Sequence, residues 1–160
     1  MYSFFKNIYK ILIPKSWQFK IEPFIRKIVY NLIYKGGKTI CLICSAKSKK
    51  FIPISFHNSG DKICPNCGAL SRSRALGEYV SRNFKNRSLK ILDFSPHRSL
   101  HDFFKSIFEN YISSDFENQF FAQKNYDITK INEADQSFDL IICFHVLEHI
   151  LEDKKAIKEL

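Results

Sequence analysis

Two pairs of cysteines constrain this chain more than any other feature of its sequence. Cys41 and Cys44 form one C-x-x-C pair, and Cys64 and Cys67 form a second pair after a spacer of 19 residues. This spacing is typical of a structural zinc site, because two residues between thiolates let one tight turn present both sulfur atoms to one ion. Gly68 follows the second pair and permits the backbone to turn away. We expect four thiolates around one zinc ion, with no position left open for catalysis.

Two other interpretations of the cysteines stay open. A C-x-x-C pair is also a redox motif, and cysteines without a ligand can fill a core. The fifth cysteine, Cys143, lies inside an apolar run. The chain starts without a signal-peptide pattern, and no window approaches the roughly 18 apolar residues of a membrane span. We therefore expect metal ligation in a reducing compartment, the cytoplasm, and no transmembrane segment.

Charge is distributed unevenly along the chain. Residues 1–90 contain 18 Lys and Arg against 3 Asp and Glu, whereas residues 91–160 contain 7 against 13. This asymmetry indicates two parts with different surfaces. The basic part favours an anionic partner such as RNA, DNA or a membrane surface.

Residues 1–37 predict a basic helical arm made of two short amphipathic helices. The first places apolar side chains on one face: Phe4, Phe5, Ile8, Ile11 and Leu12. Pro14 interrupts the pattern, and the second helix is expected to carry Pro23 in its first turn and to end at Gly36 and Gly37. Such an arm either packs its apolar stripe on the rest of the protein or makes peripheral membrane contact through residues 1–35.

The remaining chain predicts two further parts. Residues 38–86 are expected to form the zinc-binding module, with short strands around the cysteines and a linker helix from Ser71 to about Phe84. From residue 87 to 160 the pattern alternates between strands and helices. Strands are predicted over 90–95, 111–114, 126–128 and 138–144, with helices over 100–108 and from the last strand to residue 160. The apolar run at 138–144 is typical of a strand buried on both faces of a parallel sheet.

Polar residues follow the predicted strands. In a doubly wound sheet, ligands bind outside the carboxyl ends of the strands, near the point where the strand order reverses. The second strand ends at Asp115, which is placed to accept both ribose hydroxyls of a nucleoside. The other strands lead into the following residues: Asp93 to His97, Asp127 to Thr129, and His145 to His149.

These residues resemble those of a known family. Asp115, the Asp127–Thr129 segment and the run from Ser137 to Ile150 are similar to the class I S-adenosylmethionine-dependent methyltransferases of the type 11 group. The segment from Cys64 to Arg74 resembles a narrower branch, in which a cysteine knuckle and an Arg-bearing helix precede the methyltransferase domain. The resemblance covers about residues 38–160.

The resemblance implies a partial Rossmann-like α/β sheet preceded by a small zinc-ribbon-like module. It also implies S-adenosylmethionine as the cofactor and a role for each matching residue. Asp93 and Ser95 would border the methionine moiety, and Asp115 would take the ribose hydroxyls. Asp127 and Ile128 would flank the adenine. His145 would lie close to the transferring methyl group.

The sequence departs from the family pattern in two places. The glycine-rich loop after the first strand is replaced by Ser95 and Pro96. Glycine permits close approach of the backbone to a ligand, whereas proline fixes φ and removes a donor. The family also continues through a glycine-containing turn and three more strands, so the sequence predicts a fragment or a truncated gene.

Catalysis by positioning alone could suffice, but a hydroxyl or amine nucleophile needs a base, for which His145 and Glu148 are the candidates. Glu148 and His149 alternatively only cap or pair on a helix. The same stretch matches the H-x-x-E-H pattern of some zinc proteases, which requires one continuous helix. The methyl acceptor is either a small molecule or RNA, the latter suggested by Arg72 and Arg74. The alternative function is a non-enzymatic zinc-ribbon protein that binds nucleic acid or acts as a scaffold.

Overall fold

The computed structural model describes residues 15–54, 60–117 and 122–160, with side chains from residue 21 onward. The chain forms two compact units that divide between Arg74 and Ala75. The first predicted helix of the arm lies outside the described residues. The division falls inside helix α3, Ser71–Asn83, which was predicted as the linker helix.

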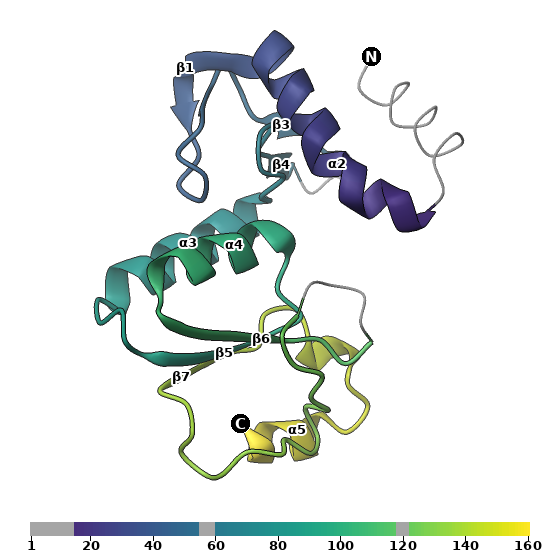
Figure 1. The fold of residues 1–160 in the computed structure, drawn as a ribbon, viewed down its shortest axis with the longest axis vertical. Helices are drawn as coiled ribbons and strands as arrows, with labels where there is room; N and C mark the ends of the chain where they lie inside the picture. Colours follow the sequence, from purple (N-terminus) through teal and green to yellow (C-terminus); the bar gives the residue numbers. More distant parts are fainter. Residues whose placement is uncertain (1–14, 55–59, 118–121) are drawn as a thin grey trace. The chain divides into compact units, whose positions relative to one another are not determined.

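The first unit starts with a helix that is longer than predicted (Figure 1). Helix α2 spans Lys15–Val29 and continues into a π-helical turn, η1, Tyr30–Tyr34. The expected start at Pro23 was wrong, since Pro23 lies inside α2. A proline removes one helical hydrogen bond, and here the turns on both sides of it continue the helix. The helical segment ends just before Gly36, close to the predicted end.

Short strands surround the two cysteine pairs. Strand β1, Lys35–Ile40, pairs antiparallel with β2, Lys47–Ser48, and β3, Ile52–Pro53, pairs antiparallel with β4, Lys62–Ile63. The Tyr30 hydroxyl donates to the carbonyl of Lys47 at 2.8 Å and so joins η1 to β2. Two-stranded sheets of this length are marginal in water. The first unit therefore needs a further source of stability.

The second unit contains a parallel sheet, as predicted for a partial Rossmann-like fold. Its elements in chain order are β5, Lys90–Phe94; α4, Arg98–Ile107; β6, Asn110–Ser114; β7, Leu140–Ile142; a 3₁₀ turn η2, Leu147–His149; and α5, Asp153–Glu159. The strand order is β6-β5-β7, and both pairings are parallel. The chain leaves β5 toward β6 and returns to the other side of β5 for β7. The strand order therefore reverses at β5.

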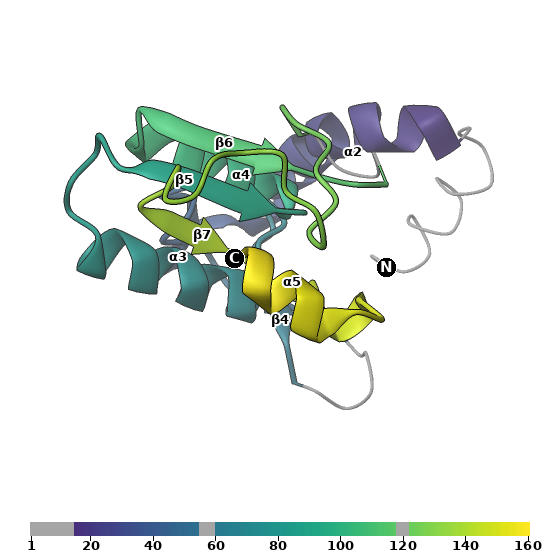
Figure 2. The ribbon, with the colours of Figure 1, turned by 90° about the horizontal axis from the view of Figure 1, so that it is seen from below.

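Helices α4 and α5 lie on opposite faces of this sheet (Figure 2). Side chains alternate along a strand. On the α5 face, Leu92 and Phe94 pack with Ile128 and Ala156. On the α4 face, Tyr111 of β6 contacts Phe104 of α4, with ring centroids 6.0 Å apart. The apolar run of β5 is therefore buried on both sides, as expected for a central parallel strand.

Three details of the second unit differ from the prediction. Tyr126–Ile128 is not a strand: Asp127 forms an isolated bridge with Lys130 at the ends of a turn. The Asp127 carboxylate accepts hydrogen bonds from the backbone and hydroxyl of Thr129, and such local bonds compete with strand pairing. Strand β7 is shorter than the predicted run over 138–144. The last helix is also discontinuous, since η2 precedes α5.

Candidate functional site

The four paired cysteines come together in the first unit as a candidate zinc centre. Their sulfur atoms all lie within 4.8 Å of one another. The Sγ atoms of Cys41 and Cys67 are 3.8 Å apart, as are those of Cys44 and Cys64. Four sulfur atoms at bonds of about 2.3 Å around a tetrahedral ion would lie about 3.8 Å apart. The donor set and its spacing therefore fit zinc.

The backbone of each pair forms the turn that such a centre requires. The carbonyl of Cys41 accepts from the amide of Ser45 at 2.8 Å, and that of Cys64 accepts from the amide of Gly68 at 3.0 Å. Ser45 and Gly68 both adopt positive φ, at 56° and 80°. Gly68 was predicted to let the backbone turn away after the second cysteine pair. Ser45 occupies the equivalent position after the first pair, where a serine adopts the left-handed conformation.

The cysteine cluster is also the centre of the first unit. Cys41 and Cys64 are fully buried. The Asn66 side-chain amide lies 3.4 Å from the Sγ atom of Cys44 and can donate to a thiolate there. The pKa values of Cys41 and Cys67 are raised by hydrogen bonds to the neighbouring cysteines. Full ionisation of the cluster therefore calls for a cation, which a bound metal would supply.

Arg26 of α2 lies against this centre, which sequence reasoning missed. Its guanidinium carbon is 3.3 Å from the position that a Cβ atom at Gly68 would occupy. One guanidinium edge pairs with Glu22, and the other nitrogen, Nη1, is buried without a hydrogen-bond partner. Four thiolates around a zinc ion carry a net charge of −2, so a buried cation beside the second turn complements them.

Arg74, one of the two arginines considered for RNA, is occupied within the first unit. Its Nη1 donates to the carbonyls of Ala69 and Lys62, at 2.7 Å and 3.0 Å. Its guanidinium lies 4.3 Å from the ring centroid of Phe51. These contacts fix the start of α3 against the second cysteine turn, and they give Arg74 a structural role.

The second candidate site lies at the carboxyl ends of β5, β6 and β7. The strand order reverses at β5, and in sheets of this kind ligands bind beyond the carboxyl ends of the strands at such a reversal. Ser95 follows β5 directly, and His145 lies shortly after β7. Both residues adopt left-handed backbone conformations, with φ of 48° and 59°. Such strain in non-glycine residues collects at functional sites.

Ser95 and Asp115 connect the ends of β5 and β6. The Ser95 hydroxyl donates to Oδ1 of Asp115 at 2.8 Å, and the Ser95 amide donates to the carbonyl of Ser114 at 2.7 Å. Asp115 is buried at this edge. A carboxylate has about four acceptor positions, so it can serve the serine and a ligand together. The left-handed Ser95 provides the sharp turn that a glycine provides in the family pattern.

Asp93 is a buried carboxyl group beneath α4. It is 2% exposed, and the Tyr111 hydroxyl donates to its Oδ2 at 2.8 Å. Burial raises the pKa of Asp93 to about 7, and the hydrogen bond from Tyr111 opposes this shift. The sequence placed Asp93 beside the methionine moiety. The carboxylate lies on the α4 face of the sheet with Tyr111, a partner that was not foreseen, and the predicted role of Asp93 stays a prediction.

The residues predicted to flank the adenine have different surroundings. Asp127 is half-buried, and hydrogen bonds from Thr129 lower its pKa. Ile128 is 4% exposed, and its side chain packs in the core on the α5 face of the sheet. The structure therefore brings Ser95 and Asp115 together directly, whereas the side chain of Ile128 belongs to the core.

His145 and Glu148 form a pair after β7. Nδ1 of His145 lies 2.6 Å from Oε1 of Glu148, and both side chains are about half exposed. Hydrogen bonds from its own backbone amide and from His145 lower the pKa of Glu148. Because Glu148 and His149 lie in a three-residue 3₁₀ turn, the continuous helix that an H-x-x-E-H zinc site needs is absent from this described segment.

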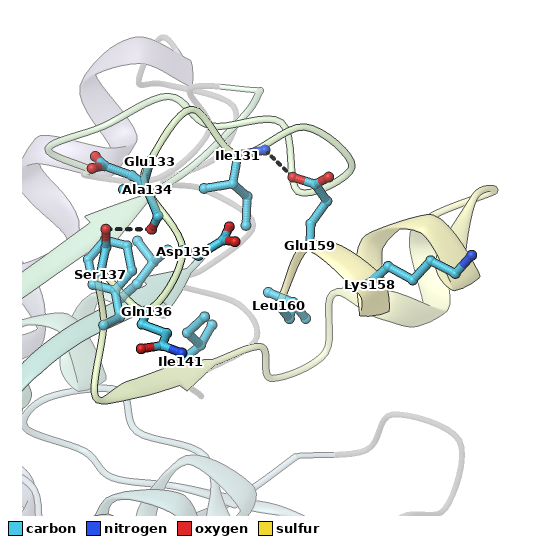
Figure 3. A pocket seen from close by; sticks show the side chains of 12 residues that line it. Ile131, Glu133, Ala134, Asp135, Gln136, Ser137, Ile141, Lys158, Glu159 and Leu160 are labelled. Atoms are coloured by element: carbon cyan, nitrogen blue, oxygen red, sulfur yellow. Dashed lines mark hydrogen bonds between the residues drawn. The ribbon is translucent and has the colours of Figure 1, made fainter.

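A cavity of about 200 Å³ lies elsewhere in the second unit, between the 131–138 loop and the end of α5 (Figure 3). Leu92 and Ile141 of the sheet contribute to its wall. Glu159 of α5 accepts from the amide of Ile131 at 3.0 Å across this region. None of the predicted cofactor residues lines the cavity. It lies on the α5 face of the sheet, away from the carboxyl edge.

The parallel sheet with order β6-β5-β7 is consistent with a partial Rossmann-like methyltransferase fold. Residues 95–160 match the family model described as "Methyltransferase domain". This match covers 66 of the 160 residues and supports the resemblance to class I methyltransferases seen in the sequence. No curated protein and no solved structure matches the chain. Among the described residues, the four paired cysteines are the group that could hold a metal ion.

Proposed function

We propose that the second unit transfers a methyl group from S-adenosylmethionine to an acceptor held at the carboxyl edge of the sheet. The observation that supports this proposal is the hydrogen bond between Ser95 and Asp115 at the ends of β5 and β6, in a segment that matches a methyltransferase domain model. The sulfonium of the cofactor would supply the electrophilic methyl group. The acceptor is a small molecule or RNA.

Asp115 would bind the ribose of the cofactor. It directly follows β6 at the carboxyl edge of the sheet, and a carboxylate can accept from two neighbouring hydroxyl groups. Ser95 would hold this carboxylate in place through its 2.8 Å hydrogen bond. The turn at Ser95 leads into α4, whose first residue is Arg98. The chain thus supplies a carboxylate and a sharp backbone turn at adjacent strand ends, which fits a nucleoside ligand.

His145 would act as the base toward the acceptor. Glu148 accepts from Nδ1 of the ring, so the proton is held on Nδ1 and the lone pair on Nε2. A hydroxyl or amine nucleophile could then give its proton to Nε2. His145 adopts a left-handed backbone conformation shortly after the end of β7. We expect ¹⁵N NMR to find the Nδ1–H tautomer of His145 and Glu148→Ala to abolish that preference.

The cysteine cluster would hold a structural zinc ion. Four thiolates leave no open position, so the ion would stabilise the first unit and take no part in methyl transfer. Zinc thiolates of this kind persist in a reducing environment, which fits the cytoplasm. Metal analysis of the purified chain should return one zinc per chain, and a folded protein without metal would contradict this part.

Calorimetric titration of S-adenosylhomocysteine into the zinc-loaded chain tests the cofactor site. We expect micromolar binding that Asp115→Ala weakens by about 10–100-fold, because hydrogen bonds to a charged acceptor are lost. Asp115→Asn keeps an acceptor for Ser95 and controls for folding. Asp135→Ala changes an exposed carboxylate in the same unit and should leave binding unchanged.

The outcome also separates the two functions considered for this chain. Absence of binding by a folded, zinc-loaded chain would count against the cofactor site. The alternative, a zinc-ribbon protein that binds nucleic acid, would then be tested by RNA retention. Binding of that kind weakens steeply as the salt concentration rises.

A further inference from the structure

The segment formed by α2 and η1 has two different faces. One face packs within the first unit: Tyr30 is buried and hydrogen bonded to the carbonyl of Lys47, and Arg26 lies against Gly68. This face already accounts for how the segment is attached to the zinc module. The other side of the same segment is therefore available for another purpose.

That other side is an exposed apolar stripe. Phe24, Ile28 and Leu32 follow one another at intervals of four residues, and their exposed fractions are 68%, 43% and 77%. Ile25 adjoins them at 37%. Residues four apart in a helix lie on one face. We define the α2 stripe as these four exposed, large apolar side chains on one side of the helical segment.

The surroundings of the α2 stripe are strongly basic. Residues 15–50 contain nine Lys and Arg and a single acidic residue, Glu22. Glu22 is paired with Arg26 on the packed side. Lys27 is exposed on α2, beside Ile28 in the sequence, and Lys35 and Lys38 are exposed in β1. An apolar stripe with basic residues close to it in the sequence suits a partner surface that has an apolar interior beneath negatively charged groups.

We propose that the α2 stripe docks on an anionic lipid bilayer, with the helical segment lying in the plane of the interface. Amphipathic helices with large apolar groups on one side and lysines on the other bind bilayers in this way. Anionic headgroups would attract Lys27, Lys35 and Lys38 while the stripe enters the acyl boundary. No described helix is long and apolar enough to cross a membrane, so contact would be at the surface.

Two other occupants fit the charges and the side chains less well. A second copy of the chain would bring two strongly basic surfaces together, which repel each other. Nucleic acid would match the lysines, but it binds through aromatic stacking and basic grooves and gains nothing from exposed Ile28 and Leu32. The lipid surface uses both the charge and the aliphatic side chains. This inference does not depend on the proposed methyl transfer.

Flotation of the full zinc-loaded chain with vesicles tests the proposal. Vesicles of phosphatidylcholine alone and of phosphatidylcholine with phosphatidylglycerol are compared at low and high salt. We expect flotation with the anionic vesicles and much weaker flotation with the neutral ones. Raising the salt concentration should reduce binding to the anionic vesicles, because it screens the lysines.

Matched variants identify the surface. Phe24→Ser with Leu32→Ser should reduce partitioning at least about tenfold, because both side chains leave the interface. Leu151→Ser removes a fully exposed leucine from the second unit and should change nothing. Lys27→Gln should weaken binding to anionic vesicles about fivefold, and Lys154→Gln should not. Since the substituted side chains are exposed, zinc content and circular dichroism should match those of the unmodified chain.

Four results would overturn the proposal. The chain could stay in the unbound fraction with all vesicles, or the stripe variant could float as well as the unmodified chain. Sedimentation analysis could instead find a dimer that the stripe variant abolishes, in which case a second copy covers the stripe. Equal flotation with neutral and anionic vesicles would remove the role of the lysines.

Discussion

Ser95 is the residue at which this chain departs most clearly from the glycine-rich loop of related methyltransferases. A serine in the left-handed region has a steric cost that glycine does not have, and here the hydroxyl compensates by bonding to Asp115. The same side chain that strains the turn therefore also joins two strand ends. At this position the chain has a serine where the family pattern has a glycine, and the serine hydroxyl makes a hydrogen bond that a glycine could not make.

Two substitutions at Ser95 separate these effects. Ser95→Ala should lower the free energy of unfolding by about 1–2 kcal/mol, because the hydrogen bond to the buried Asp115 is lost while the strain stays. Ser95→Gly loses the same bond but relieves the left-handed strain, so it should be about 1 kcal/mol more stable than the alanine variant. Urea denaturation measures both. Equal stability of the two variants would contradict the strained turn.

Asp93 makes a different prediction, on the pH dependence of stability. Its pKa in the folded chain is raised to about 7 by burial, above its ordinary value of 3.8. The folded state thus binds more protons than the unfolded state between these values. Its contribution to stability is fully present below about pH 4 and is lost as the pH rises through about 7.

Asp93→Asn should remove this pH dependence, since an amide does not ionise and still offers an acceptor to Tyr111. At pH 8 the variant should be more stable than the unmodified chain by about 2–4 kcal/mol, and at pH 4 the two should be similar. Urea denaturation at both pH values gives the comparison. Tyr111→Phe is the complementary variant. It removes the hydrogen bond that opposes the raised pKa of Asp93, so the loss of stability with rising pH should be larger. A constant difference between the asparagine variant and the unmodified chain would refute the assignment.

At the scale of elements, α2 is more than an appended arm. Its packed side reaches the second cysteine turn through Arg26, while its exposed side carries the α2 stripe. One edge of the Arg26 guanidinium donates to Glu22, whereas Nη1 is buried without a hydrogen-bond partner, so Nη1 can contribute only through charge and packing. A zinc tetrathiolate at the cysteine cluster would supply negative charge beside it. Helix position and metal binding would then be coupled.

Arg26→Ala should accelerate zinc release to a chelator by about tenfold, because a favourable charge contact of about 1–2 kcal/mol is lost next to the thiolates. Arg26→Lys keeps the charge and should fall between the alanine variant and the unmodified chain. Arg82→Ala removes an exposed arginine paired with Glu78 in α3 and is the control. Release followed with a colorimetric zinc indicator measures the rates. Equal rates for all variants would exclude the coupling.

At the scale of the whole molecule, the two units differ in what holds them together. Fully buried residues of the first unit include the cysteines Cys41 and Cys64, and its short strands form two separate two-stranded sheets. The second unit has apolar side chains packed on both faces of a parallel sheet. Metal ligation should therefore carry most of the stability of the first unit and little of that of the second.

Chelation of the metal tests this difference. We expect amide protection in residues 35–70 to be lost when zinc is removed, while protection in β5 and β6 remains. Hydrogen exchange with and without a chelator measures this, and Cys64→Ser should reproduce the chelated pattern. A loss of protection in β5 that equals the loss in β1 would show that the two units unfold as one.

Much of this organisation is encoded locally and was predicted from the sequence. The spacing of the cysteines alone indicates a shared ion, because a C-x-x-C turn is a local structure, and the four sulfur atoms do come together. Periodicity likewise predicted α3, α4, β5 and β6 close to their observed bounds. The predicted strand at 126–128 was wrong, because local hydrogen bonds at Asp127 replaced strand pairing. The predicted extent of β7 was also too long.

The sequence by itself thus determined most of the types of element, the cysteine spacing that builds the cluster and the strand ends that hold polar residues. Only the tertiary structure decided which of these residues meet. Asp93 turns inward to Tyr111, Ser95 bonds to Asp115, and Arg26 reaches Gly68 across 42 positions of the chain. The physical reason is that propensity and spacing act over a few residues. Burial and hydrogen bonding between distant segments depend on how sheets and helices pack.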